Sequence, residues 1–512
     1  MHFWESVLCA LLASLFAAIL GGLYLTGAFR KRRPKEPPLE KGLIPWLGHG
    51  ISFQKNPVEF LEKMKKKHGD IFTVLVGGNY INFMMDPHTY GTIVKESKDK
   101  LDFDTFASTV LYNAFGFHPS KSHHKVVQEV SKKYLRNKNL ADLNQVMMEN
   151  LKTVMLQHLG SGDGERPWQQ DGVLHFSYKA MFQAAFLTLF GSDPCKSGDS
   201  KESLKDHRAP QCGEWFEDFQ KFDSYFPQMV MGMLDPGTKK ETERLKNFFW
   251  DVLSVEMLSQ KENISNWVAE IDSQTGADIT EKMRAKAMFA LLWASQANTG
   301  PATFWVFVHL LKHPETMKAV KEEVDRVLKE TNQEVKPGSP SIQVSFETIK
   351  TPLLDSAVQE SLRLKVSPFL FRSIMEDMDL KMADGREYSL RKGDQLIMFP
   401  FIGLQMDPEI YPEPRTFKYD RFVNPDGTRK EFYKNGEKLK YFNMPWGAGP
   451  SMCPGRFFAV SEMKLFVMLM VTYFDMELVN KEEEIPPVDP SRYGIGTTHP
   501  AHDIQFRYRL RI

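Results

Sequence analysis

Three long apolar stretches stand out along this chain of 512 residues. Residues 7–29 contain no charged side chain and are long enough to cross a bilayer as one helix. Residues 281–311 and residues 456–474 are each predicted to form one long helix. Pro301 lies inside the first of these two helices, and because proline removes a backbone hydrogen bond, we expect that helix to bend there.

Shorter patterns between these stretches indicate further helices and a few strands. Residues 57–68 and 353–364 have the spacing of helices. Residues 71–76 and 79–84 are typical of two paired strands. Residues 193–210 are polar and are predicted to form a loop. The expected fold class is therefore α+β, mainly α with small β-sheets.

The residues around the first apolar stretch favour a membrane anchor with a lumenal N-terminus. Only His2 and Glu5 are ionisable before it, whereas a basic run at residues 30–33 follows it. The positive-inside rule then places the rest of the chain in the cytosol. A cleaved signal peptide is the alternative, but such peptides carry a basic region before a shorter apolar core.

These observations divide the chain into three parts. Residues 1–29 are the predicted lumenal N-terminus and transmembrane anchor. Residues 30–50 are basic and rich in proline and glycine, so we expect a stiff hinge there. Residues 51–512 are the predicted catalytic domain.

Composition excludes some classes of protein. The chain carries 65 basic and 65 acidic residues, so its formal net charge of zero argues against a nucleic-acid binder. Its four cysteines, at positions 9, 195, 212 and 453, form no CxxC pair and no zinc-finger spacing. They are typical of reduced thiols in a protein that faces the cytosol.

A glycine-rich loop at residues 446–455 presents Cys453 just before the last apolar helix. Glycines at positions 447, 449 and 455 permit backbone torsions and close approach that other residues forbid, so the loop can lie flat beneath a planar ring system. A helix N-terminus favours an anion, and the thiolate is the form of cysteine that binds iron. A buried structural cysteine in a tight turn is the alternative interpretation of this residue alone.

The spacing of Trp446, Gly447, Gly449, Cys453 and Gly455 resembles the Phe-Gly-x-Gly-x-x-x-Cys-x-Gly haem loop of the cytochrome P450 superfamily. Tryptophan stands in place of the usual phenylalanine, and a serine occupies the position of a basic residue that contacts a haem propionate. The resemblance implies the cytochrome P450 fold and a haem b cofactor. It implies Cys453 as the metal ligand, with Trp446, Gly447 and Gly449 also binding the cofactor.

The stretch before Pro301 corresponds to the family's Ala-Gly-x-(acid)-Thr pattern, whose acid and alcohol deliver protons to oxygen. Aligning Ala294 and Ser295 with Ala-Gly puts Asn298 at the alcohol, whereas a shift of one residue puts Thr299 there. No carboxylate is present in either alignment. We therefore expect an ordered water, held by Asn298 or Thr299, to carry the proton, which makes these two the catalytic candidates.

Two further family motifs follow in the expected order. Glu360 and Arg363 share a helix face, and the resemblance implies that they form a buried structural network with Arg421. In the segment that crosses the haem in this family, Arg372 is the candidate for a propionate contact. The candidates for substrate binding are Phe369, Leu370 and, at a hairpin tip near the C-terminus, Thr497.

Within the superfamily the chain is similar to the branch that contains the sterol hydroxylases of bile-acid synthesis and prostacyclin synthase. This similarity implies hydroxylation of a sterol, at the 12α position of a 7α-hydroxylated 4-en-3-one sterol. The reaction would consume O2 and NADPH through NADPH-cytochrome P450 reductase. The implied partners are the sterol, the reductase and membrane lipid, with no nucleic acid. The implied location is the endoplasmic reticulum membrane, with a single membrane pass and a cytosolic catalytic domain.

Three alternatives stay open. A sterol 7α-hydroxylase would use the same chemistry at another carbon. An endoperoxide isomerase like prostacyclin synthase would need neither reductase nor oxygen, and an asparagine without an acid in the distal helix suits it. A haem sensor or carrier would bind haem without turnover.

Overall fold

The computed structural model describes residues 2–156, 167–194, 201–277, 279–333, 342 and 349–511. The chain folds into two compact units, each assembled from three separate segments. Unit 1 comprises Met1–Phe106, Pro368–Pro412 and Phe432–Met444. Unit 2 comprises Ala107–Ser367, Glu413–Glu431 and Pro445–Ile512.

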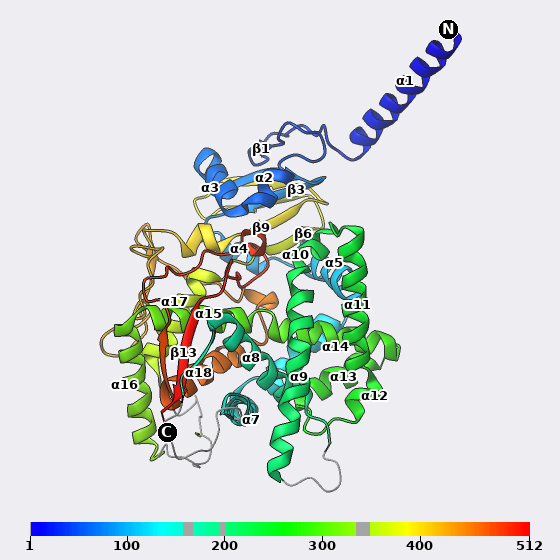
Figure 1. Ribbon diagram of the computed structural model, residues 1–512. Coiled ribbons are helices and arrows are strands. Elements are labelled where there is room, and N and C mark those ends of the chain that lie inside the picture. The colour runs from blue at the N-terminus through cyan, green and yellow to red at the C-terminus, as the bar shows by residue number, and fades with distance from the viewer. Residues whose placement is uncertain are drawn as a thin grey trace. The chain divides into compact units, whose positions relative to one another are not determined.

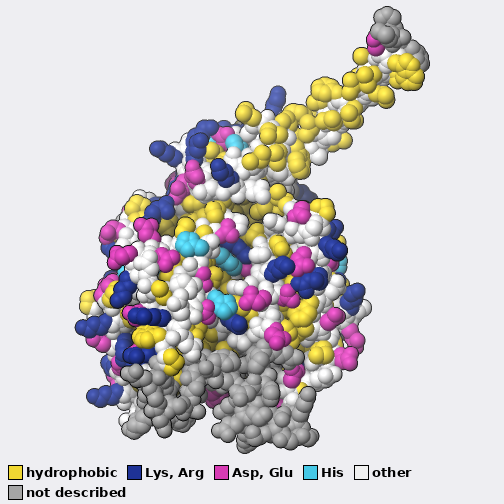
Figure 2. All heavy atoms as spheres, viewed as in Figure 1, with side chains coloured by type: hydrophobic (Ala, Val, Ile, Leu, Met, Phe, Trp, Pro, Cys, Tyr) yellow, Lys and Arg dark blue, Asp and Glu magenta, His cyan; other side chains and the backbone are white. Residues whose placement is uncertain are grey.

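Unit 1 begins with α1 (His2–Leu25), an apolar helix. None of its residues Trp4–Leu25 is buried, and Figure 2 shows hydrophobic side chains along its length. Among the described residues this is the one helix long and apolar enough to cross a membrane. The helix is consistent with membrane anchoring, because it is long enough to cross a bilayer and its apolar side chains are exposed.

The chain after α1 is attached to the sheet of unit 1. The Arg30 guanidinium donates to both oxygens of Asp394, at 2.6 and 2.8 Å, and lies 4.4 Å from the centre of the Tyr80 ring. The Tyr80 hydroxyl in turn donates to the carbonyl of Gly27 at 2.7 Å. The segment predicted as a hinge therefore begins at a residue fixed by an ion pair and a cation–π contact.

A mixed sheet of six strands forms the centre of unit 1. The two predicted strands are confirmed, since Ile71–Val76 and Asn79–Met84 pair antiparallel around Gly77 and Gly78, whose φ angles are positive as a tight hairpin requires. The order is β1 (Leu39–Glu40), β2 (Ile71–Val76), β3 (Asn79–Met84), β9 (Gln395–Met398), β6 (Leu370–Ile374) and β4 (Leu101–Asp102).

Short helices and two hairpins complete unit 1. The predicted helix at residues 57–68 is confirmed, and it begins where the Asn56 side chain accepts from the Glu59 amide and Pro57 takes the first position. The remaining elements are α2 (Gly50–Lys55), α3 (Pro57–His68), α4 (Tyr90–Lys95), a π-helical turn (Phe401–Gln405), and the hairpins β7 (Met378–Lys381) with β8 (Glu387–Leu390) and β10 (Tyr433–Lys434) with β11 (Glu437–Lys438).

Unit 2 is a helical assembly around α15 (Thr299–Lys312), which contacts α8, α17 and α18 (Figure 1). Its Trp305 is completely buried. The other helices are α5 (Asp104–Phe115, entering from unit 1), α6 (His123–Tyr134), α7 (Asn137–Leu156), α8 (Val173–Phe190), α9 (Lys201–Ser224), α10 (Phe226–Met231), α11 (Pro236–Val252), α12 (Val255–Ser259), α13 (Asn266–Gly276), α14 (Glu281–Gln296), α16 (Pro314–Glu330), α17 (Pro352–Lys365) and α18 (Arg456–Tyr473).

A small sheet and two short turns complete unit 2. The sheet is antiparallel, in the order β12 (Phe474–Leu478), β13 (Gln505–Leu510) and β5 (Gln169–Gly172). The 3₁₀ turns are Gly449–Ser451 and Pro490–Arg492. The expected class, mainly α with small β-sheets, is confirmed.

Two expectations about helices are wrong. The stretch 281–311 is two helices, α14 and α15, because the chain leaves regular helix at residues 297–298, four residues before Pro301. A proline ring clashes with the carbonyl four residues earlier and offers it no N–H, so the interruption appears upstream of the proline itself.

The predicted loop is also wrong from residue 201 onward, where α9 begins. Polarity does not separate a solvated helix from a loop when the residues are good helix formers. The other part of that loop, residues 195–200, lies outside the described residues.

Candidate functional site

The loop that carries Cys453 is a tight turn just before α18. Gly447 and Gly449 have φ angles of 71° and 67°, in the left-handed region that glycine enters without strain. The Cys453 amide donates to the Trp446 carbonyl at 2.9 Å and closes the turn. Gly455 differs from the expectation, since its φ is −82° and it simply precedes the first residue of α18. It has open space where a side chain would project, so only two of the three glycines are required by backbone torsion.

Opposing electrostatic effects act on the pKa of the Cys453 thiol. Cys453 is a free cysteine. Burial raises the pKa of its thiol, while hydrogen bonds from the amides of Gly455 and Arg456 and the positive charge of Arg456 lower it. The donors are those of the first turn of a helix, which has unpaired amides. A positive partner at the sulfur would complete the stabilisation of a thiolate.

Helix α6 contacts this loop through the side chain of Gln128. Gln128 donates from its side chain to the Met452 carbonyl at 3.2 Å. Arg456 donates to the Cys453 carbonyl at 2.9 Å. The sequence predicts neither contact, because Arg456 follows the motif as the first residue of a helix and no local pattern identifies Gln128. A hollow of about 140 Å³ lies beside the loop and is lined by Gln128, Glu129, Lys132, Arg136 and Pro454.

The structure brings Asn298 and Thr497 together, although one is a catalytic and the other a substrate-binding candidate. The Asn298 side-chain oxygen accepts from the Thr497 amide at 3.0 Å. The Thr299 hydroxyl donates to the Ser295 carbonyl at 3.3 Å. The side-chain oxygen of Asn298 therefore accepts from the backbone near the C-terminus. The amide hydrogens of Asn298 and the lone pairs of the Thr299 hydroxyl could bind a water.

Glu360, Arg363 and Arg421 form one buried ion-pair network. The guanidinium of Arg363 makes two bonds to the Glu360 carboxylate, at 2.7 and 2.8 Å, and Arg421 makes a third at 2.7 Å. The exposed fractions are 0% for Glu360 and Arg363 and 7% for Arg421. Further donors of the two arginines reach the carbonyls of Pro414 and Thr416. Buried charges persist only when paired and hydrogen-bonded in this way.

The remaining candidates, Arg372, Phe369 and Leu370, belong to unit 1. Arg372 is buried and donates to the Phe371 carbonyl at 2.6 Å. Burial lowers the pKa of its guanidinium, and the charges of Asp102 and Asp104 oppose that shift. No carboxylate of the described residues lies within ion-pair distance of it. Its charge is therefore available to an anionic group.

Phe369 and Leu370 are both half-buried. The Phe369 ring packs against those of Phe53, Phe83 and Phe399, with ring centres 4.7 to 6.1 Å apart. This residue thus takes part in the aromatic packing of unit 1. Its role in binding substrate stays a prediction.

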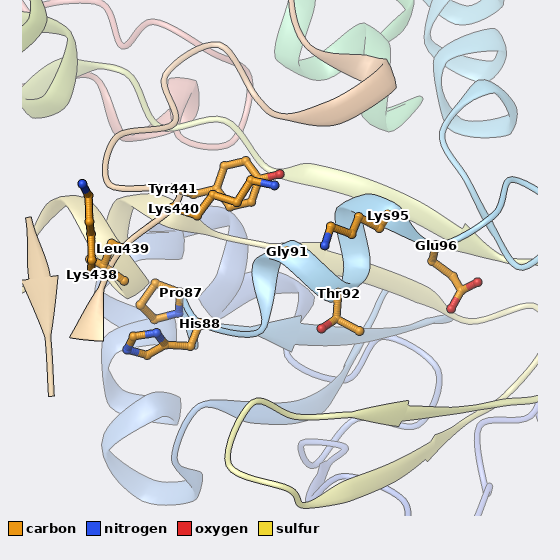
Figure 3. A pocket seen from close by; sticks show the side chains of 10 residues that line it. All are labelled: Pro87, His88, Gly91, Thr92, Lys95, Glu96, Lys438, Leu439, Lys440 and Tyr441. Carbon is orange, nitrogen blue, oxygen red and sulfur yellow. The ribbon is translucent and has the colours of Figure 1, made fainter. Parts of the chain in front are cut away.

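Unit 1 also contains a hollow of about 500 Å³ (Figure 3). Figure 3 labels its lining residues, which include His88, Lys95, Lys438 and Lys440 with a single carboxylate, Glu96. None of the predicted site residues lines it. Its polar, open character differs from an enclosed apolar site for a lipid.

Comparison with known proteins identifies the family. The model of the family described as Cytochrome P450 matches residues 37–506. The "7-alpha-hydroxycholest-4-en-3-one 12-alpha-hydroxylase" of Oryctolagus cuniculus is 46% identical over 508 residues, which cover 99% of each chain. The "5-beta-cholestane-3-alpha,7-alpha-diol 12-alpha-hydroxylase" of Sus scrofa is also 46% identical, over 100% of this chain and 99% of its own. "Prostacyclin synthase" of Rattus norvegicus is 41% identical over 98% and 99% of the two chains. The chain belongs to the cytochrome P450 family.

Membership of this family implies a haem whose iron is bound by a cysteine thiolate, and the residues present fit that group. Cys453, which is half-buried, offers a sulfur toward which two backbone amides are directed, and a bound cation would stabilise the thiolate form of that sulfur. Gly447 and Gly449 lie in the loop before Cys453. They have left-handed backbone torsions and carry no side chains that would obstruct a bound planar group.

Cys453→Ala is expected to abolish thiolate ligation, because it removes the one thiol of the glycine-rich loop at residues 446–455. The measurement is the absorbance of the reduced protein under carbon monoxide, in which thiolate-ligated haem has a strongly red-shifted Soret band. Cys9→Ala, an exposed position, is the matched control and is expected to keep the band. A red-shifted band in Cys453→Ala would contradict the assignment of the ligand.

Glu360→Gln is expected to destabilise the protein by about 3–5 kcal/mol, because it leaves two guanidiniums buried without their countercharge. Unfolding by urea, followed by tryptophan fluorescence, measures the change. The control is Glu330→Gln, which removes an exposed partner of Arg326 and is expected to cost at most about 0.5 kcal/mol. Equal effects of the two substitutions would show that the buried network has no special weight.

Proposed function

We propose that this protein is a haem-thiolate monooxygenase that hydroxylates a sterol, at the 12α position of a 7α-hydroxylated 4-en-3-one sterol, in bile-acid synthesis. The observation that carries the proposal is 46% identity over 99% of both chains with an enzyme named 7-alpha-hydroxycholest-4-en-3-one 12-alpha-hydroxylase. Cys453, in a loop with the family's spacing, supports the same reaction class.

The bound haem would supply activation of O2, since thiolate ligation favours cleavage of the O–O bond. Cys453 would hold the iron, with the amides of Gly455 and Arg456 directed at its sulfur. Trp446 closes the loop through its carbonyl. Arg372 is the proposed partner of a haem propionate. Their common task is to fix the position and charge of the cofactor.

Proton delivery is proposed to pass through a water held at the interruption between α14 and α15. The residue before Asn298 is Ala297, so no carboxylate stands at the position of the family's acid in either alignment. The Asn298 amide and the Thr299 hydroxyl offer two donors and an acceptor that are free of backbone bonds. A water bound between them would pass a proton without a titrating side chain.

Phe369, Leu370 and Thr497 are the proposed substrate-binding residues. Phenylalanine and leucine side chains suit the apolar rings of a sterol, and the Thr497 hydroxyl would supply one polar contact for orientation. The rigid ring system must present a single carbon to the oxidant. The position of these side chains to within about half an ångström would therefore decide which carbon is hydroxylated.

The proposed electron donor is NADPH-cytochrome P450 reductase, and the proposed location is the endoplasmic reticulum membrane. The basic side chains of Lys132 and Arg136 line the hollow beside the Cys453 loop, where they would attract an acidic partner. The apolar helix α1 supports a single-pass anchor over residues 1–29. The hinge at 30–50 would then connect it to a cytosolic catalytic domain at 51–512, to which a sterol can partition from lipid.

An endoperoxide isomerase is the second candidate. Prostacyclin synthase is 41% identical over nearly the whole chain, and the absence of an acid at residues 297–298 suits a reaction that needs no proton delivery. The lower identity places it behind the hydroxylase. The two reactions differ in their demand for electrons.

Turnover of a 7α-hydroxylated 4-en-3-one sterol by the purified protein is expected to require both NADPH and reductase. Mass spectrometry of the product would detect one added oxygen, and its fragments would locate it at carbon 12. Omission of reductase is the control and is expected to give no product. Conversion of a prostaglandin endoperoxide without reductase, together with no reaction on sterols, would establish the isomerase instead.

Asn298→Ala is expected to lower the product formed per NADPH oxidised by at least about twofold to tenfold, which is the range for a single lost hydrogen bond. The substitution removes the acceptor of the Thr497 amide as well as the amide donors toward the water. Asn298→Asp keeps an acceptor at that place and is expected to lose less. Unchanged coupling in Asn298→Ala would remove this residue from the proton path.

A further inference from the structure

A buried ion pair connects the C-terminal part of unit 2 to the end of α9. The carboxylate of Asp223, near the end of α9, lies 3.0 Å from a guanidinium nitrogen of Arg492. The same nitrogen donates to the backbone carbonyl of Asp223 at 2.7 Å. Asp223 is 1% exposed and Arg492 is 5% exposed. A guanidinium bound by both the side chain and the backbone of one residue has little freedom to move.

The Asp223 carboxylate has two further neighbours. Its other oxygen accepts from the indole of Trp293, in α14, at 2.8 Å. The Trp293 ring stacks on that of Phe226, in α10, with ring centres 3.8 Å apart and planes 18° apart. A ring nitrogen of His499 lies 3.5 Å from the oxygen that faces Arg492. One carboxylate thus joins α9, α14 and the C-terminal segment.

The chain that follows this ion pair, residues 493–498, is here called the C-terminal loop, and it reaches the interruption between α14 and α15. The Thr497 amide donates to the Asn298 side chain at 3.0 Å. A Cβ on Gly496 would lie 2.4 Å from the same Asn298 oxygen, so the loop backbone approaches Asn298 closely. A predicted substrate-binding residue and a predicted catalytic residue therefore depend on where this loop lies.

The C-terminal loop is attached to unit 2 at two places. The Ser367 amide donates to the Gly496 carbonyl at 2.8 Å, and the Thr498 amide donates to the Lys365 carbonyl at 2.8 Å. These bonds fix the far end of the loop to the segment after α17. The ion pair of Arg492 fixes its beginning to α9. A loop held at one end can pivot about that end, and a second attachment removes this freedom.

We propose that Asp223 and Arg492 are positioning residues that determine which carbon of the substrate is hydroxylated, because they fix the C-terminal loop and thereby Thr497. Neither residue is assigned contact with substrate or cofactor. The effect on selectivity rests on the proposed function, whereas the effect on the loop does not. A rigid sterol must present one carbon to within about half an ångström, so a small displacement of Thr497 would change the product.

The effect on the loop is tested by hydrogen exchange of the holoenzyme, with mass spectrometry of peptides spanning residues 493–500. Asp223→Asn keeps an acceptor for the Trp293 indole but removes the negative charge of the pair, and the loop amides are expected to exchange about tenfold faster. Asp475→Asn makes the same change in the more exposed ion pairs of β12 and is the matched control. It is expected to leave exchange in the loop unchanged.

A double variant separates the position of the loop from the stability of the protein. Asp223→Asn alone leaves a buried guanidinium without its countercharge, whereas Asp223→Asn with Arg492→Met leaves no stranded charge. The double variant is therefore expected to unfold in urea closer to wild type than the single variant, while its loop still exchanges fast. Wild-type exchange in either variant would overturn the proposal. If the single variant fails to fold, the double variant decides alone.

The effect on selectivity is tested by the ratio of product hydroxylated at carbon 12 to products hydroxylated elsewhere. The ratio is expected to fall about threefold or more in the double variant and to stay unchanged in Asp475→Asn. Arg492→Lys keeps a cation beside Asp223 and is expected to lose less. A wild-type ratio in the double variant would overturn the proposed selectivity role. A wild-type protein that converts no sterol would refute the proposed function, while the exchange data would still decide whether the pair fixes the loop.

Discussion

The electrostatic environment of the Cys453 sulfur is the constraint around which the loop before α18 is built. Burial by itself drives the thiol of Cys453 toward its neutral form. Only directed amides and a cation offset that tendency, and the amides exist because α18 begins directly after the loop. Three features fix the position of this sulfur. They are the left-handed torsions of Gly447 and Gly449, the hydrogen bond from the Cys453 amide to the Trp446 carbonyl, and the buried helix α18 that follows.

Elsewhere in unit 2 the opposite problem arises, since the interruption between α14 and α15 leaves polar backbone groups without helical partners. Pro301 leaves the Ala297 carbonyl without a helical donor, and the Thr497 amide, near the C-terminus, donates to the side chain of the neighbouring Asn298. Asn298 and Thr497, which make the connecting hydrogen bond, are 199 residues apart in the sequence. The polar groups proposed to serve proton delivery are therefore oriented by a segment that no local pattern connects to them.

The buried ion-pair network of Glu360, Arg363 and Arg421 holds a segment of irregular backbone in place. Such a network adds little net stability compared with apolar side chains, yet loss of one member leaves charges stranded. Its donors also bind the carbonyls of Pro414 and Thr416, so it shapes a stretch that has no helix or strand of its own. Geometry here is maintained by side chains where backbone ladders are lacking.

The sequence by itself determined the features that depend on neighbouring residues. Local periodicity and turn chemistry predict the strands at 71–76 and 79–84, the helices at 57–68 and 353–364, and the apolar N-terminal helix. The spacing of the Cys453 loop is local in the same way. Only the tertiary structure decided that the Asn298 side chain accepts from the Thr497 amide and that Asp223, Arg492 and His499 lie together. Those contacts join segments far apart along the chain, and hydrogen bonds and ion pairs of that kind leave no period in the sequence, because their geometry exists only once the core has packed.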